Sequence, residues 1–212
     1  MAYIIGILTL AFGVTLMEKA NLGISMVVAP AYLISLKFDF LTFGMAEYIL
    51  QALLLIVVFL IVGKFKLSYC FSFVTALIYG VVLDSFMWLI RNVPADIFLF
   101  RISLYSIGML FCSFGISMFF HTYLAPEVYE LFVKEISKKF GIDINRFKIG
   151  YDCASCTVAI IMSLIFFSDI RGVGIGTILC AVINGNIIGL FSRLLEKYID
   201  FSPRFTTARY FE

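Results

Sequence analysis

The chain has 212 residues, of which 62% are hydrophobic, 17% aromatic and only 14% charged, and its mean hydropathy is +1.05. A soluble domain carries about 25% charged and about 45–50% apolar residues. A water-soluble fold of this composition would have too few polar side chains to cover its surface, which excludes an ordinary cytosolic enzyme and a secreted disulfide scaffold. The net charge of +2 is too balanced for a nucleic-acid partner. The composition therefore predicts an integral membrane protein whose main partner is the lipid bilayer.

Six apolar segments are candidates to cross the bilayer as helices, which takes about 20 predominantly apolar residues each. In chain order they are 3–17, 43–62, 67–90, 98–120, 149–167 and 173–195. Two further segments, 25–36 and 126–140, are too short or too charged to cross. The sequence thus predicts an all-α integral membrane protein with six transmembrane helices and two short non-crossing helices.

The two halves of the chain resemble each other. Gly6 and Gly13 are matched by glycines 102 residues later, at Gly108 and Gly115. The string LISLKF also recurs, at the same offset, as EISKKF. Glycines that are seven residues apart share one face of a helix, so we expect close helix crossings at these positions.

A longer loop in the second half moves the offset to 105 residues, which aligns Glu47 with Asp152 and Gly80 with Gly185. Each half then consists of a long helix, a short helix and two long helices. We therefore expect two membrane repeats, 1–97 and 98–199, followed by a polar cytoplasmic tail, 200–212. Because each repeat has three crossings, the two repeats must be inverted relative to each other.

The basic residues predict the orientation, because Lys and Arg favour the cytoplasmic side of a membrane. With six crossings, both termini lie on the side that carries 11 of the 16 basic residues. These are Lys64, Lys66, Lys134, Lys138, Lys139, Arg146, Lys148, Arg193, Lys197, Arg204 and Arg209. We expect this side to be cytoplasmic.

Two stretches resemble a known family. LGISM follows the first helix, and GVGIGTILCAVINGNIIGLF runs from Gly172 to Phe191. Together they resemble the YczE/YitT-type family of bacterial multi-pass membrane proteins, and the resemblance covers most of the chain. Where that family usually has Gly-Pro late in the second motif, this chain has Gly185-Asn186. The resemblance implies a protein of the bacterial cytoplasmic membrane and implies no particular substrate.

Ionisable groups within a span are candidate functional residues, because each costs about 2.5–3.5 kcal/mol at the helix centre. Glu47 and Asp152 each lie about one turn into a span, and Gln51 follows Glu47 on the same helix face. Either they bind a substrate or coupling ion, or the carboxylates only stabilise helix amino ends in headgroup water. Asp84 lies deeper in its span, where it either lines a pathway or pairs locally with Arg91.

The last span contributes two further candidate groups. Asn184 and Asn186 lie near its predicted midplane, where amides either bond neighbouring helices or line a site. The span begins with a glycine motif that comprises Gly172, Gly174, Gly176 and Thr177. Backbone N–H groups at a helix start can hold an anion, whereas glycines at that place also permit close packing.

Inverted repeats with polar groups between them are typical of secondary transporters. We therefore expect a transporter of a small solute or ion, with the substrate site between the repeats. A channel has the same symmetry, and a membrane-embedded substrate-binding or accessory subunit is a third interpretation. The sequence has one histidine and no HExxH or nucleotide-binding motif, so we expect neither an enzyme nor a metal or other cofactor. A homodimer is left open.

Overall fold

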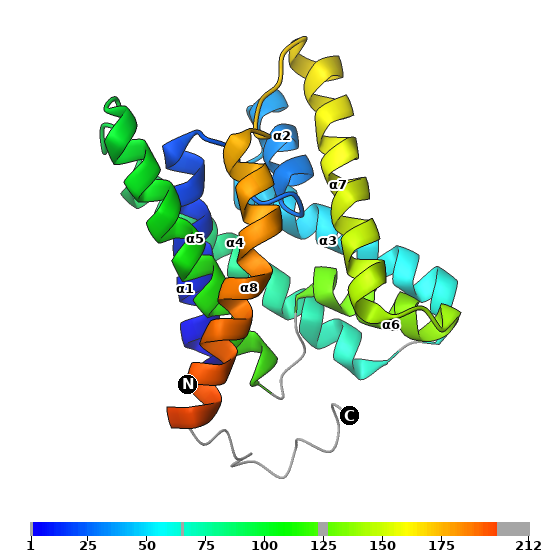
Figure 1. Ribbon diagram of the computed structural model, residues 1–212. Helices are drawn as coiled ribbons and strands as arrows, with labels where there is room; N and C mark the ends of the chain where they lie inside the picture. Colours follow the sequence, from blue (N-terminus) through cyan, green and yellow to red (C-terminus); the bar gives the residue numbers. More distant parts are fainter. Residues whose placement is uncertain (1, 65, 123–126, 199–212) are drawn as a thin grey trace.

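A computed structural model describes residues 2–64, 66–122 and 127–198, and over these residues the chain is entirely helical between its loops (Figure 1). The helices are α1 (Ala2–Ala20), α2 (Ala29–Lys37), α3 (Phe43–Val62), α4 (Leu67–Leu89), α5 (Phe98–Phe120), α6 (Val128–Phe140), α7 (Ile144–Phe167) and α8 (Ile175–Tyr198). All except α2 and α6 are long and apolar enough to cross a membrane. The predicted all-α fold is confirmed, and the protein is a multi-pass membrane protein.

Some helix boundaries differ from the prediction. α1 continues past residue 17 to Ala20, because the guanidinium of Arg101 donates a hydrogen bond of 2.7 Å to the carbonyl oxygen of Ala20. α7 begins at Ile144, five residues before the predicted start, because the side chain of Asp143 accepts a hydrogen bond from the backbone N–H of Arg146. Such an N-cap satisfies one of the free donors at a helix start. The predicted tail 200–212 lies outside the described residues.

α1 and α5 lie side by side and cross at two pairs of glycines (Figure 1). A Cβ added to Gly13 would lie 2.6 Å from the carbonyl oxygen of Gly108, and one added to Gly6 would lie 3.3 Å from that of Gly115. The helices are therefore antiparallel. The predicted close crossing is confirmed, and it has the backbone-to-backbone character typical of helices that associate in lipid.

α3 and α4 approach each other equally closely. A Cβ added to Gly80 would lie 2.7 Å from the carbonyl oxygen of Gly44. α7 and α8 are also consecutive long helices, but over the described residues they make no comparable contact. A Cβ added to Gly150 or Gly185 would have no atom of another segment within 4 Å.

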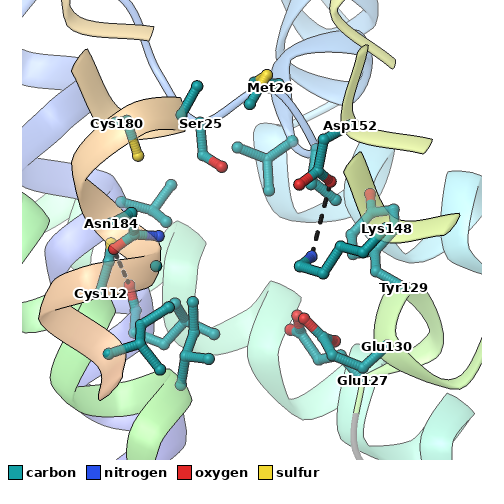
Figure 2. A pocket seen from close by; sticks show the side chains of 18 of the residues that line it. Ser25, Met26, Cys112, Glu127, Tyr129, Glu130, Lys148, Asp152, Cys180 and Asn184 are labelled. Carbon is teal, nitrogen blue, oxygen red and sulfur yellow. Dashed lines mark hydrogen bonds and ion pairs between the residues drawn. The ribbon is translucent and has the colours of Figure 1, made fainter. Parts of the chain in front are cut away.

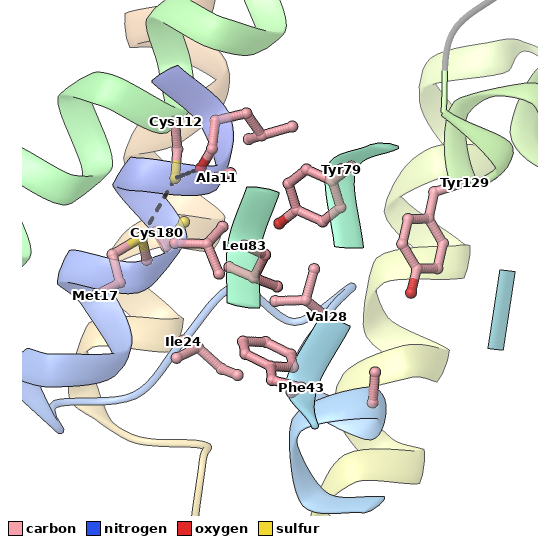
Figure 3. Packing of buried hydrophobic residues seen from close by; sticks show 14 of the residues in the cluster. Ala11, Met17, Ile24, Val28, Phe43, Tyr79, Leu83, Cys112, Tyr129 and Cys180 are labelled. Carbon is pink, nitrogen blue, oxygen red and sulfur yellow. Dashed lines mark hydrogen bonds between the residues drawn. The ribbon is translucent and has the colours of Figure 1, made fainter. Parts of the chain in front are cut away.

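The core lies where α1, α4 and α5 meet the loop after α1 and the start of α3 (Figure 3). Met17, Ile24 and Leu83 are at most 2% exposed there. By contrast, many apolar side chains point outward, and Leu60 and Ile165 are more than 70% exposed. Such faces suit lipid, since a soluble protein rarely exposes apolar surface on this scale.

Candidate functional site

A cavity of about 330 Å³ lies between two walls of the helix bundle (Figure 2). α5 and α8 form one wall, α6 and α7 form the other, and α1 with segment 25–28 contributes from the first half of the chain. Cavities of about 300–1,000 Å³ are typical of sites for small molecules. The cavity is thus large enough for a small ligand and is built from both halves.

The charged groups lie on the wall formed by α6 and α7. Glu127 and Glu130 come from the start of α6, and Lys148 and Asp152 come from the first three turns of α7. The Nζ atom of Lys148 lies 3.6 Å from Oδ1 of Asp152. Figure 2 shows the ammonium of Lys148 extending between Asp152 and the two glutamates. Three carboxylates therefore face one ammonium.

Glu127 is the most deeply buried of these acids, with 7% of its surface exposed. It occupies the N-cap position of α6, but its side chain makes no capping hydrogen bond. Among the described residues its Oε1 atom has no hydrogen-bond partner. Burial raises the pKa of Glu127, and the charges of Glu130 and Glu47 raise it further. Burial also raises the pKa of Glu130, against the opposing effect of the Lys148 ammonium.

A buried hydrogen-bond network behind this wall fixes the start of α6 on α3. The hydroxyl of Tyr129 donates a hydrogen bond of 2.8 Å to Oε2 of Glu47. The amide nitrogen of Gln51 lies 3.4 Å from the same oxygen, and its Oε1 accepts from the backbone N–H of Val128 at 3.2 Å. Glu47 and Gln51 are completely buried. They therefore position Glu127 and Glu130 rather than face the cavity directly.

The opposite wall is mainly apolar and carries one amide. Asn184 of α8 accepts a hydrogen bond of 2.5 Å from Ser113 of α5 through its side-chain oxygen. Figure 2 shows its nitrogen turned toward the cavity. Around it lie apolar or weakly polar side chains, namely Leu10, Val14, Met17, Cys112, Ile116, Cys180 and Ile188.

The structure separates five of the residues predicted from the sequence into three groups. Asp152 and Asn184 line the cavity, and Glu47 and Gln51 lie directly behind it. Asn186 is exposed on α8 and is not among the described lining residues. The proposed midplane pair of amides is therefore divided between the cavity and the outer face of α8.

Asp84 lies outside the described lining of this cavity and has a structural role. Its carboxylate accepts hydrogen bonds from the hydroxyl of Thr42 at 2.5 Å and from the backbone N–H of Gly44 at 2.8 Å. It therefore fixes the start of α3 against α4. These partners lie at the start of a neighbouring helix, whereas the partner considered from the sequence, Arg91, is only seven residues further along the chain.

The glycine motif at the start of α8 packs against the loop after α1. The backbone N–H of Gly176 donates to the carbonyl oxygen of Leu22 at 2.9 Å, and that of Gly174 donates to the hydroxyl of Thr177 at 3.1 Å. The carbonyl oxygen of Gly172 accepts from the backbone N–H of Ile24 at 3.0 Å. The backbone N–H groups of Gly174 and Gly176 are therefore already hydrogen-bonded within the protein. This favours a role of the motif in close packing over a role in binding an anion.

Glu127, Glu130 and Lys148 were not among the predicted site residues. In the sequence, the two glutamates belong to a charged amphipathic stretch, and Lys148 counts as a loop cation before the fifth span. The offset of 102 residues aligns 127–130 with 25–28, but only the structure shows that both segments line the cavity.

The fold and the cavity define a helical multi-pass membrane protein with a charged internal site. The chain belongs to a family of unknown function, DUF6198, which matches residues 1–193. It is 25% identical over 202 residues to the uncharacterized protein YyaS of Bacillus subtilis (strain 168), covering 93% of this chain and 94% of that protein. No solved structure matches it. The resemblance to the YczE/YitT-type family stays a prediction.

Proposed function

We propose that this protein is a transporter of a small solute or ion, which it binds in the cavity between two inverted repeats. The observation that carries the proposal is that matching segments of the two halves both line the cavity. Segments 25–28 and 127–130 occupy matching positions in the two halves of the sequence, and both reach the same cavity. A site shared in this way by both repeats is characteristic of secondary transporters.

The glycine contacts between α1 and α5 support the inverted repeat. Gly6 meets Gly115, and the offset of 102 residues converts this pair into Gly108 and Gly13. The second pair is the one in contact at the other end of the crossing. A two-fold axis between antiparallel helices requires this pattern, in which residue i contacts residue j and the counterpart of i contacts the counterpart of j.

A difference between the halves supports alternating access. In the first half α3 and α4 pack directly at Gly44 and Gly80, whereas in the second half α7 and α8 stand apart around the cavity. If the repeats exchange conformations, α7 closes on α8 while α3 separates from α4. Such an exchange would open the site alternately to the two sides of the membrane.

The proposed orientation has both termini in the cytoplasm, in the cytoplasmic membrane of a bacterium. Basic residues gather at the end of the bundle where α1 begins and α8 ends. Lys66 forms an ion pair of 2.6 Å with Glu135 of α6 at that end, and Lys138 and Lys139 lie in the last turn of α6. The positive-inside rule assigns this end to the cytoplasm.

Cross-linking of α7 to α8 tests the proposal. A disulfide requires Cα atoms about 4.4–6.8 Å apart, so the separated helices must move before one forms at mid-depth. The variant Ile149→Cys/Gly185→Cys, in a background without the native cysteines, places thiols at the positions that match Gly44 and Gly80. We expect an oxidative cross-link in membranes, and none for the outward-facing control pair Ile165→Cys/Val182→Cys. Absence of the first cross-link would contradict alternating access.

Flux separates the transporter from the two other interpretations. Once a transported solute is in hand, movement of that solute against its gradient at the expense of a proton or sodium gradient identifies a transporter. Flux that only runs downhill indicates a channel, and a stable complex with an ATPase indicates an accessory subunit. The cavity favours the transporter over an open channel, because buried Met17, Ile24 and Leu83 fill the bundle at the loop after α1.

A further inference from the structure

We infer that the cavity binds a small organic cation, an ammonium group on an apolar body, with Glu127, Glu130 and Asp152 as its counter-charges. This inference rests on the proposed function, and it names the class of solute. It starts from the uneven distribution of charge in the cavity. The carboxylates and the ammonium lie on the wall formed by α6 and α7, and the wall that faces them is largely apolar (Figure 2).

The charges leave room for one positive charge. Three carboxylates face the single ammonium of Lys148. The amino ends of α2 and α6, which follow the two lining segments 25–28 and 127–130, each add about half a positive charge. With all the acids ionised, the cavity remains about one unit negative. A monovalent cation neutralises it, whereas an anion would add to the excess.

In the part of the chain that the structure describes, one carboxylate oxygen of Glu127 is left without a partner, although the Gln51 side chain hydrogen-bonds to this carboxylate. It is more than nine-tenths buried, it lines the cavity, and its Oε1 atom has no hydrogen-bond partner among the described residues. Although it stands at the N-cap of α6, it does not cap the helix. A buried carboxylate oxygen without a donor is costly, and an ammonium in the cavity would supply the missing donor.

The ammonium of Lys148 lies close to the position proposed for the ammonium of the ligand. Its Nζ atom is 3.6 Å from Asp152, longer than a hydrogen bond, and its side chain is 44% exposed. An ammonium donates to carboxylates with three N–H groups. A ligand ammonium between Asp152 and the glutamates would make the same contacts, and the lysine ammonium would move aside while it stays at the rim of the cavity. Lys148 therefore competes with the ligand instead of binding it.

The rest of the cavity selects an organic cation over a metal ion. Leu10 and Val14 of α1 and Ile188 of α8 provide apolar surface that a metal ion cannot use. Within the described residues, no three His, Cys, Asp or Glu side chains are grouped so that they could hold a metal ion. A volume of about 330 Å³ admits a body the size of a phenyl ring with a short chain.

Calorimetric titration of the purified protein with three matched probes tests the inference. The probes are 2-phenylethylammonium, neutral 2-phenylethanol and anionic 3-phenylpropanoate. The variants are Glu127→Gln, Glu130→Gln and Lys148→Gln, and the control is Asp39→Asn, which changes an exposed carboxylate in the loop between α2 and α3. Thermal melting without probe establishes that each variant is folded.

We expect the ammonium probe alone to bind. Each glutamate variant should lower its affinity about tenfold or more, since each removes a charged partner. Lys148→Gln should raise the affinity, a direction that general damage to the fold cannot produce, and Asp39→Asn should leave it unchanged. Should Glu127→Gln fail to fold, Glu130→Gln and Lys148→Gln still test the inference, because they should change the affinity for the ammonium probe in opposite directions.

Equal or tighter binding of the neutral or anionic probe, or a lower affinity in Lys148→Gln, would overturn the inference. Its failure can be told apart from that of the proposed function. Absence of ammonium binding together with the α7–α8 cross-link removes the solute class and leaves the transporter. Ammonium binding without the cross-link leaves a cation site in a protein that does not alternate.

Discussion

Gly80→Ala is the sharpest test of the packing between α3 and α4. The added methyl carbon would lie 2.7 Å from the carbonyl oxygen of Gly44 and 3.2 Å from the ring of Tyr48. Both distances are shorter than ordinary van der Waals contacts, and the nearer atom belongs to the backbone, so the helices must move apart. Overpacking of this kind costs about 1–3 kcal/mol. We expect the midpoint of thermal unfolding to fall by about 2–12 °C, since 1 kcal/mol corresponds to about 2–4 °C in a chain of this size.

The second half of the chain offers a matched control. Gly185 aligns with Gly80, but a Cβ at Gly185 would meet no atom of another segment within 4 Å. Gly185→Ala should therefore unfold at the parent temperature or slightly above, since alanine favours a helix by about 1 kcal/mol over glycine. Thermal melting in one detergent compares the two variants. Equal losses at both positions, or no loss in Gly80→Ala, would refute the close α3–α4 packing and the open α7–α8 gap.

Three further predictions concern the groups that support the site. Arg101→Lys should lower the free energy of unfolding by about 1–2 kcal/mol in chemical denaturation, because the guanidinium bonds two carbonyl oxygens at the end of α1 and an ammonium cannot reproduce this fork. In a double-mutant cycle, Glu47→Gln and Tyr129→Phe should be coupled by about 1 kcal/mol through their 2.8 Å hydrogen bond, and additive effects would contradict this contact. Burial raises the pKa of Glu127 and Glu130 above the unfolded value, so the stabilisation of their neutral forms is complete below that value and is lost as the pH rises through the folded pKa. The melting temperature should therefore fall from acidic to neutral pH, less steeply in Glu127→Gln, and a rise with pH would count against the buried acids.

Much of the fold follows from the sequence because a bilayer restricts the choices. Long apolar segments must become helices there, since every backbone group has to be satisfied within its own segment. The span 43–62 was therefore predicted at its observed bounds, α3 (Phe43–Val62). The glycines of α1 and α5 were also predictable as crossing points, because only residues without a side chain allow such close packing.

At two of the helix ends that differ from the predicted ones, the helix extends through charged residues. α1 runs on through Glu18 and Lys19, beyond the predicted end at residue 17, because Arg101 of a distant helix binds the carbonyl oxygens of Ala20 and Asn21. α7 starts early because the short-range cap at Asp143 begins the helix before its apolar part. Charged residues end an apolar pattern, but they do not by themselves end a helix.

Composition and hydropathy predict the membrane class, the six long helices and the intramembrane carboxylates as candidate groups, since these depend on the composition of single segments and on the cost of charge in lipid. The packing of the helices against one another determines which groups each carboxylate contacts. Asp84 is bonded to the start of α3, Glu47 is buried beneath Tyr129, and Asp152 faces the cavity. The same packing also brings Glu127 and Lys148 from a charged stretch and a predicted loop into that cavity. Periodicity fixes the face of a helix on which a side chain lies, whereas the partner of that face is fixed by how the helices pack.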